Sequence, residues 1–238
     1  MRYFVITDVH GFYDEMIEAL DLAGFDPNNE DHWLISLGDV FDRNDKPIEV
    51  IRYLNRLPRK TLIRGNHEDL LEELMRQSRL VGSHDFHNGT VNTIETLTGK
   101  TLTKSNFNQL MDELQMNTDI REYYSRLVDY EEIGDYIFVH AWIPMFRDDW
   151  RESTAGEWEQ ARWWNPYREW AEYGSPDEKT VVCGHWATAY GNSRYHNKGA
   201  DWGEDACYEP FVDDGIIGLD ACTAYTKKCN VAVIDINE

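Results

Sequence analysis

Short apolar runs alternate with amphipathic segments at the start of the chain. Residues 2–7 form an apolar run rich in β-forming side chains, and residues 13–23 then place apolar side chains at helical spacing. The same order recurs at 32–37, 47–57 and 60–64. Strands that are separated by helices pair in parallel through right-handed crossovers. The pattern therefore predicts an α/β unit with a parallel sheet.

The pattern changes in the middle of the chain. Residues 69 to about 128 have mostly helical spacing, broken at 82–89, which predicts a helical insertion that we call the cap. Beyond the cap, 128–133 and 136–140 are typical of a hairpin. Further strands are predicted at 180–183, 215–219 and 230–236. We expect this second half to be antiparallel and α+β, and no linker divides the chain, so 1–238 is predicted to be one domain.

Composition and charge exclude several classes of protein. Hydrophobic residues make up 42% of the 238 residues, which is typical of a folded globular protein and not of a disordered one. The net charge of −21 opposes binding along a nucleic-acid backbone. No apolar run approaches the ~20 residues that a membrane span needs. The four cysteines have no CxxC spacing, so we expect free thiols and a cytoplasmic protein.

Polar side chains with metal-binding chemistry follow five of the predicted strands. They are Asp8 and His10, Asp39 and Asp42, Asn66 and His67, His140, and His185. In open α/β sheets, ligands bind outside the carboxyl ends of the strands, so these loops are expected to converge. Each motif alone is ordinary, since an Asp-x-His-Gly run often caps a helix and a histidine at a strand end is often a hydrogen-bonded core residue. Five such motifs in one chain, with complementary ligand types, indicate one shared site.

The set of donors predicts the chemistry. Carboxylate, amide oxygen and imidazole suit divalent Mn, Fe, Zn or Mg, and no thiolate is among the donors. The donors exceed what one ion needs, and two ions ~3.5 to 4 Å apart require a shared ligand, for which a carboxylate is suited. Such a centre turns bound water into hydroxide near neutral pH for in-line attack on phosphorus. The pattern therefore predicts a two-metal phosphoester hydrolase.

The motifs together resemble those of the calcineurin-like metallophosphoesterases. The resemblance is closest to the phosphoprotein phosphatase group, with its compact bacterial and lambda-type bacteriophage Ser/Thr enzymes. It is carried by Asp8-x-His10, Gly38-Asp39-x-x-Asp42-Arg43, Gly65-Asn66-His67-Glu68, His140 and Gly184-His185. It covers nearly the whole chain and implies a four-layer α/β/β/α sandwich with a small helical cap at about 69–128.

The resemblance also implies a role for each site residue. The metal ligands would be Asp8 and His10 on the first ion, Asp39 as the bridge, and Asn66, His140 and His185 on the second ion. His67 would protonate the leaving oxygen, with Asp42 orienting its ring. Arg43 would clamp the phosphoryl oxygens through its planar fork.

Substrate contacts are less defined by the pattern. The family uses a second phosphate-binding arginine, for which Arg162 is favoured and Arg168 competes; either could instead pair with a neighbouring acid. Asn88, in an Asn-Gly pair, resembles a segment near the family's pocket, although Asn-Gly is also a turn signal. Trp186, directly after His185, could contact substrate, while most tryptophans are expected in the core.

The function expected first is a two-metal phosphomonoesterase, acting on phosphoserine and phosphothreonine in proteins and on small phosphate esters, with manganese as the favoured ion. The alternative is a hydrolase of dinucleoside polyphosphates such as diadenosine tetraphosphate. A closed aromatic slot would favour the nucleotide and an open groove the protein. A non-catalytic binding domain is a third class, but it would be expected to lack His67 or Asp39, and both are present.

Overall fold

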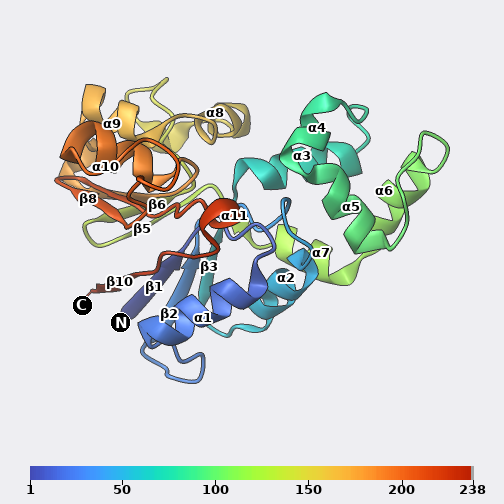
Figure 1. Cartoon of the computed structure of the whole chain (residues 1–238), viewed down its shortest axis with the longest axis horizontal. Coiled ribbons are helices and arrows are strands. Elements are labelled where there is room, and N and C mark those ends of the chain that lie inside the picture. The colour runs from blue at the N-terminus through green and yellow to red at the C-terminus, as the bar shows by residue number, and fades with distance from the viewer. Residues whose placement is uncertain (237–238) are drawn as a thin grey trace.

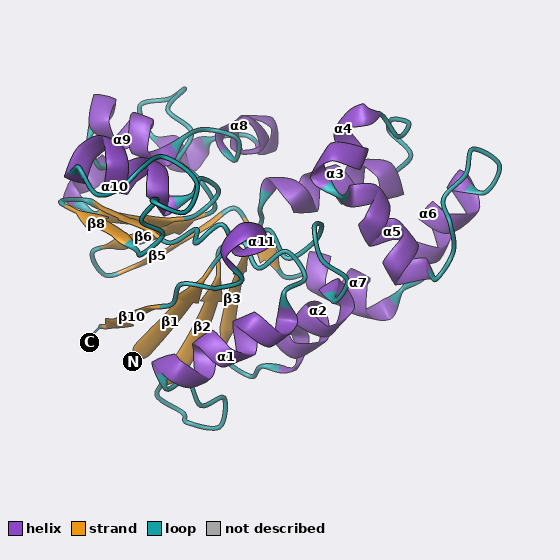
Figure 2. Ribbon diagram, viewed as in Figure 1, coloured by secondary structure: helices purple, strands orange, loops and turns teal. Residues whose placement is uncertain are grey.

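The computed structural model describes residues 1–236 and is a sandwich of two five-stranded sheets between layers of helices (Figures 1 and 2). The first sheet has the order β10-β1-β2-β3-β4. Its strands are β1 (Arg2–Ile6), β2 (His32–Ser36), β3 (Lys60–Ile63), β4 (Leu127–Val128) and β10 (Ala232–Asp235). Strands β1 to β4 pair in parallel and β10 joins the edge antiparallel to β1. The predicted parallel α/β unit is confirmed, with helices α1 (Tyr13–Ala23) and α2 (Pro47–Arg56) between its strands.

The second sheet corrects one expectation. Its order is β5-β6-β7-β9-β8, from β5 (Tyr130–Ile133), β6 (Tyr136–Val139), β7 (Thr180–Cys183), β8 (Phe211–Asp213) and β9 (Ile216–Gly218). Antiparallel pairing was expected throughout, yet the central strands β6, β7 and β9 are parallel and only the two edge pairs are antiparallel. Long connections separate the central strands, and they contain α8 (Ala155–Ala161), α9 (Pro166–Tyr173) and α10 (Thr188–His196). Connections of that length allow parallel crossovers.

The period-two alternation of the strands builds two apolar layers. Tyr3 and Val5 of β1 face the second sheet and pack in one cluster with Phe138 and Val182. Phe4, between them in the chain, faces the opposite way and joins the cluster under the helices. The two sheets therefore meet face to face, with helices on both outer faces (Figure 2).

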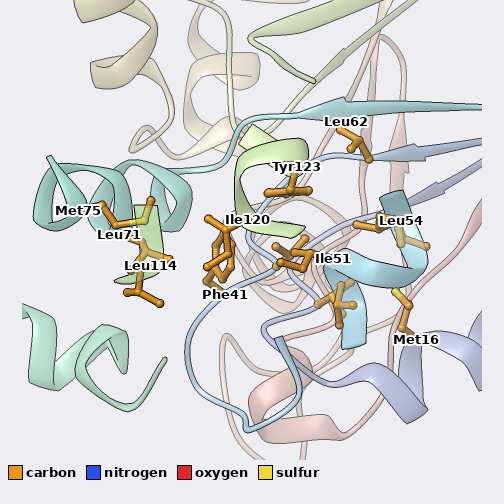
Figure 3. Packing of buried hydrophobic residues seen from close by; sticks show 14 of the residues in the cluster. Met16, Phe41, Ile51, Leu54, Leu62, Leu71, Met75, Leu114, Ile120 and Tyr123 are labelled. Carbon is orange, nitrogen blue, oxygen red and sulfur yellow. The ribbon is translucent and has the colours of Figure 1, made fainter. Parts of the chain in front are cut away.

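The cap lies on one side of the sandwich and contains four whole helices and the part of α3 that follows residue 68 (Figure 1). These helices are α3 (Asn66–Met75), α4 (Ser83–Asn88), α5 (Thr90–Thr98), α6 (Phe107–Met116) and α7 (Thr118–Tyr124). The break expected at 82–89 contains the short helix α4, because the Gly82 N–H donates to Asp85 at 2.8 Å and Arg79 holds both oxygens of that carboxylate. Figure 3 shows Leu71, Leu114 and Tyr123 of the cap in the same apolar cluster as Met16 and Ile51. The cap and the α/β unit therefore share one apolar core.

Three further features complete the fold. Two short 3-10 turns, Trp150–Glu152 and Pro176–Glu178, lie in the second half, and α11 (Thr223–Thr226) precedes β10. The four cysteines are free, as expected. Across residues 1–236 the structure has no helix with the length and apolar character to cross a bilayer.

Candidate active site

The predicted site residues meet where strands of both sheets end. β1, β2 and β3 of the first sheet deliver Asp8, His10, Asp39, Asp42, Asn66 and His67, while β6 and β7 of the second sheet deliver His140 and His185. The convergence expected from the strand ends is therefore present. Five of the predicted metal ligands are at most 2% exposed, and His185 is half-buried.

The loops that carry these residues have an unusual backbone. Twelve non-glycine residues of the described chain have positive φ, and half of them belong to the site: Asp8, His10, Asp39, Asp42, Arg43 and His185. The left-handed region is disfavoured for residues with a Cβ and costs of order 1–3 kcal/mol each, so it persists only where the surroundings impose it. The fold therefore holds these side chains in strained but defined directions.

Two glycines let the loops approach closely. A Cβ on Gly184 would lie 2.1 Å from Thr7 Oγ1 and 2.3 Å from Asp8 Oδ2. A Cβ on Gly65 would lie 2.2 Å from Asp39 Oδ1. Such distances are far inside van der Waals contact, so a side chain at either position would displace a carboxylate of the site.

Asp39 lies between the two sets of donors. Its Oδ2 is 3.8 Å from His10 Nε2, which is itself 3.9 Å from Asp8 Oδ1. Its Oδ1 is 3.5 Å from His140 Nε2 on the other side. Two ligands at ~2.1 Å from one ion lie at most ~4.2 Å apart, so each of these separations allows a shared ion. The geometry suits Asp39 as the bridge between two ions.

Two histidines have one ring nitrogen bound to a backbone carbonyl. Nδ1 of His10 donates to the Phe41 carbonyl at 2.7 Å, and Nδ1 of His140 donates to the Leu37 carbonyl at 2.8 Å. Because a carbonyl can only accept, the proton of each neutral ring lies on that nitrogen and the other carries a lone pair. Metal-binding histidines are oriented in this way. His10 Nε2 is buried and has no hydrogen-bond partner.

The electrostatics of the site favour bound cations. Burial lowers the pKa of His10 and of His185 well below the ordinary value and also lowers that of His140, which keeps the rings neutral. Burial raises the pKa of Asp39 well above its ordinary value, and the nearby Asp8 and Glu68 add to this. Neutral imidazoles around uncompensated carboxylates suit divalent ions, so the residues fit the expected two-metal centre.

The amide of Asn66 completes the second set of donors. Its Oδ1 lies 2.7 Å from His140 Nε2, and its Nδ2 is buried without a partner. With the lone pair of His140 on Nε2, both atoms that face each other are acceptors. A cation between them would satisfy both, which supports Asn66 as a ligand.

His67 lies beside His10, with ring centroids 4.7 Å apart, but it is held as an acid. Its Nδ1 donates to Asp42 Oδ2 at 2.6 Å, and Asp42 is fully buried. Burial alone would lower the pKa of His67, but the Asp39 charge and the bond to Asp42 outweigh it and raise that pKa above its ordinary value. His67 is thus suited to donate a proton from Nε2, as an oriented catalytic imidazole does.

The sequence analysis missed the residues that hold Asp42. Thr90 Oγ1 donates to Asp42 Oδ2 at 2.8 Å, and Thr93 Oγ1 donates to Asp42 Oδ1 at 2.7 Å. Thr93 Oγ1 also accepts the Asp42 N–H at 2.9 Å. Both threonines lie on α5 of the cap, about 50 residues from Asp42, so no local motif signals the contact. The cap therefore forms part of the support for His67.

The role of Glu68 was also missed, although this residue lies within the Gly-Asn-His-Glu run. Its carboxylate is fully buried and accepts the N–H groups of Asp39 at 2.9 Å, Val40 at 3.0 Å and Gly65 at 2.7 Å. These bonds tie the loop after β2 to the start of α3. The position of Glu68 three residues after Gly65, where a capping box places its acid, is the sequence signal that could have identified this structural role.

The arginines have different surroundings. Arg43 is exposed, with its Nη2 3.5 Å from His67 Nε2, so it can reach an anion beside His67. Arg162 is 4% exposed and binds Asp69 at 2.7 Å and Asp129 at 2.8 Å. The structure therefore shows the alternative considered for Arg162, pairing with neighbouring acids, and no free guanidinium fork. Arg168 is exposed and donates to the Tyr190 hydroxyl at 2.9 Å.

Two further predicted substrate contacts lie near the site in different ways. Asn88 is half-buried at the end of α4, and a Cβ on the following Gly89 would lie 2.7 Å from the Arg43 N atom, so this segment borders the Arg43 loop. Trp186 is 37% exposed and packs on Tyr190 with ring centroids 5.6 Å apart. Neither contact assigns a substrate role.

Comparison with known families agrees with this geometry. A family model described as calcineurin-like phosphoesterase matches residues 1–216, which is most of the chain. The chain belongs to the calcineurin-like phosphoesterase family. The expected resemblance is confirmed at this level. Two metal ions, when bound to a member of this family, polarise the phosphate and activate water.

Relatives of this calcineurin-like phosphoesterase carry nucleotide-hydrolase names. The asymmetrical bis(5'-nucleosyl)-tetraphosphatase PrpE of Bacillus velezensis is 29% identical over 156 residues, which are 60% of this chain and 57% of that protein. The symmetrical bis(5'-nucleosyl)-tetraphosphatase of Klebsiella pneumoniae is 41% identical over 69 residues, 29% of this chain and 24% of that protein. The chain thus spans little more than half of the first relative and about a quarter of the second.

Solved structures of similar fold cover almost the whole phosphoesterase chain. A "putative diadenosine tetraphosphatase" has a TM-score of 0.60 at 18% identity and covers 98% of this chain and 89% of its own. A cold-active protein-tyrosine phosphatase of a Shewanella species has a TM-score of 0.58 at 17% identity and covers 99% and 76%. At these identities the likeness shows the fold alone, and it confirms the predicted α/β metallophosphoesterase architecture.

Proposed function

We propose that this phosphoesterase hydrolyses dinucleoside tetraphosphates, the alternative that the sequence analysis kept open. The observation that carries its phosphohydrolase chemistry is Asp39, with one oxygen facing His10 and the other facing His140, beside the His67–Asp42 pair. The substrate class is supported by the names of both curated relatives. The Ser/Thr protein phosphatase expected first has no comparable support.

The proposed roles follow the geometry of the chain. Asp8 and His10 would hold one ion, Asn66, His140 and His185 the other, and Asp39 both. The donor set suits Mn²⁺, and it also accepts Fe, Zn or Mg. Arg43 would bind phosphoryl oxygens next to His67, and His67 would give the proton on Nε2 to the leaving oxygen. Asp42 keeps that ring fixed through its bond to Nδ1.

A second candidate is hydrolysis of phosphoserine and phosphothreonine esters, and the His67–Asp42 pair favours it. An alkoxide is a poor leaving group and needs a proton, whereas a nucleoside phosphate leaves readily without one. A buried and precisely oriented acid is most useful for the first reaction. The two candidates therefore differ in how strongly they depend on His67.

The test uses purified protein loaded with Mn²⁺. Initial rates are measured on diadenosine tetraphosphate and on a phosphothreonine peptide, with His67→Asn as the matched variant. We expect a higher kcat/KM on the dinucleotide, and chromatography of the nucleotides distinguishes asymmetrical from symmetrical cleavage. Faster, His67-dependent phosphate release from the peptide would overturn the proposal in favour of the second candidate.

We place the protein in the cytoplasm on the same basis as the sequence analysis. All four cysteines are free thiols, and Cys183 is fully buried in β7. Free thiols are typical of reducing compartments. Fractionation of cells expressing a tagged chain tests the location.

A further inference from the structure

A cavity of about 480 Å³ lies between the cap and the segment after α8. Trp163 lines it from that segment, and His84 of α4 lines it from the cap. We propose that this cavity holds a purine base of the substrate, stacked on the indole of Trp163. The inference rests on the proposed nucleotide substrate and adds the residues that would recognise its base.

Trp163 connects the cavity to the catalytic centre. Its ring packs edge-on against the ring of His185, with centroids 5.9 Å apart. His185 is a proposed ligand of the second ion. A nucleotide with a phosphate at the metal centre would therefore have this cavity as the neighbouring site for its base.

The indole of Trp163 is open to a ligand, unlike most of its neighbours. It is 40% exposed, whereas Trp142, Trp150 and Trp158 are at most 5% exposed and fill the core of the second half. The ring of His84 approaches it from the cap with centroids 5.7 Å apart and planes tilted by 55°. Because the two rings are tilted and come from different elements, a base can stack on the indole with His84 at its edge.

The polar lining favours an amino-bearing base over phosphate. Arg79 lines the cavity but forms ion pairs with Glu73 and Asp85. Its positive charge is therefore already neutralised and is not free to bind an anion. Glu159 is exposed at the wall, and its carboxylate has no hydrogen-bond or ion-pair partner in the described chain. A carboxylate repels phosphate, but it accepts hydrogen bonds from the exocyclic amino group of a base. The chemistry therefore places the base in the cavity and the phosphates at the metal centre.

The main test compares variants on a substrate with a base and on one without. Trp163→Ala is expected to raise KM for diadenosine tetraphosphate by roughly 5-fold or more, the scale of one lost stacking contact. The same variant should lose much less kcat/KM on p-nitrophenyl phosphate, which has no base, than on diadenosine tetraphosphate. Trp163→Phe should recover most of the affinity. Trp202→Ala is the matched control, since Trp202 is also exposed but contacts Tyr208 and Tyr225 instead.

Titration of adenosine 5'-monophosphate into the protein measures the base site independently of turnover. Wild-type protein and Trp202→Ala should bind it equally, and Trp163→Ala and Glu159→Gln should bind it more weakly. Equal binding by Trp163→Ala would overturn the base site, even if dinucleotide hydrolysis is present. Failure to hydrolyse the dinucleotide, with Trp163-dependent binding intact, would reject only the proposed function. Selective loss of phosphopeptide hydrolysis in these variants would show a peptide site and overturn the inference.

Discussion

Replacing Thr93 by valine should weaken both the fold and the proton donor. The hydroxyl of Thr93 donates to Asp42 Oδ1 at 2.7 Å and accepts the Asp42 N–H at 2.9 Å. Valine has nearly the same shape, so the change removes these two bonds and leaves no large cavity. Thr93 and Asp42 are both fully buried, so water cannot replace the lost partner.

The size of the effect follows from those two contacts. A hydrogen bond to a charged group contributes about 1.5–3 kcal/mol, and a buried N–H left unsatisfied costs about 1–3 kcal/mol. Because the two losses overlap at one site, we expect the free energy of unfolding to fall by about 2–4 kcal/mol. Thr90 makes only one bond to Asp42, at 2.8 Å, so Thr90→Val should have a smaller effect.

The assay combines stability with kinetics. Urea unfolding in the presence of a chelator measures the fold without any contribution from metal binding, and a loss of 2–4 kcal/mol should shift the midpoint by about 1 M. With metal restored, kcat should fall more on an alkyl phosphate than on an aryl phosphate, since the poor leaving group needs the His67 proton. Thr93→Ser keeps the hydroxyl and should restore the leaving-group dependence. An unchanged unfolding midpoint in Thr93→Val would refute the reasoning.

Three further predictions concern the metal centre. His67→Asn should retain metal but hydrolyse alkyl phosphates roughly 10²- to 10⁴-fold more slowly, and full activity would remove His67 from the mechanism. Asp39→Asn should lose metal from both positions, measured by elemental analysis, and normal content would contradict the bridge. Gly184→Ala should lower metal content, because its Cβ would lie 2.3 Å from Asp8 Oδ2. Gly156→Ala, which meets nothing within 4 Å, is its control, so equal effects of the two would count against the close packing.

The parts of the fold that the sequence predicts are those set by local apolar pattern. The strands β1, β2 and β3 and the helices between them were expected from the alternation of apolar runs, and the polar residues directly after them were expected to meet. This follows because parallel strands present their carboxyl ends at one edge. The apolar pattern therefore predicted that Asp8, Asp39 and Asn66 come together, although it contains no information about long-range contacts.

The parts that the sequence did not reveal depend on contacts across the chain. Apolar runs do not encode strand direction, so the parallel pairing of β6, β7 and β9 was missed. The two threonine partners of Asp42 are 48 and 51 residues away, on helix α5. Arg162 was expected to be a phosphate clamp, but its partner Asp69 lies 93 residues earlier in the chain. Side-chain chemistry alone does not distinguish a free guanidinium from a paired one.

The cap both holds Asp42 and lines the cavity beside Trp163. These two roles lie on different helices, so they can change separately. Through α5 the cap fixes Asp42, and through His84 of α4 it forms a wall of the cavity beside Trp163. The metal donors come from strand ends whose positions are set by the two sheets. Substitutions on the cavity side of α4 can therefore change the substrate while the metal centre is preserved. Substitutions on the Asp42 side of α5 should instead reduce hydrolysis of every substrate that needs a proton from His67.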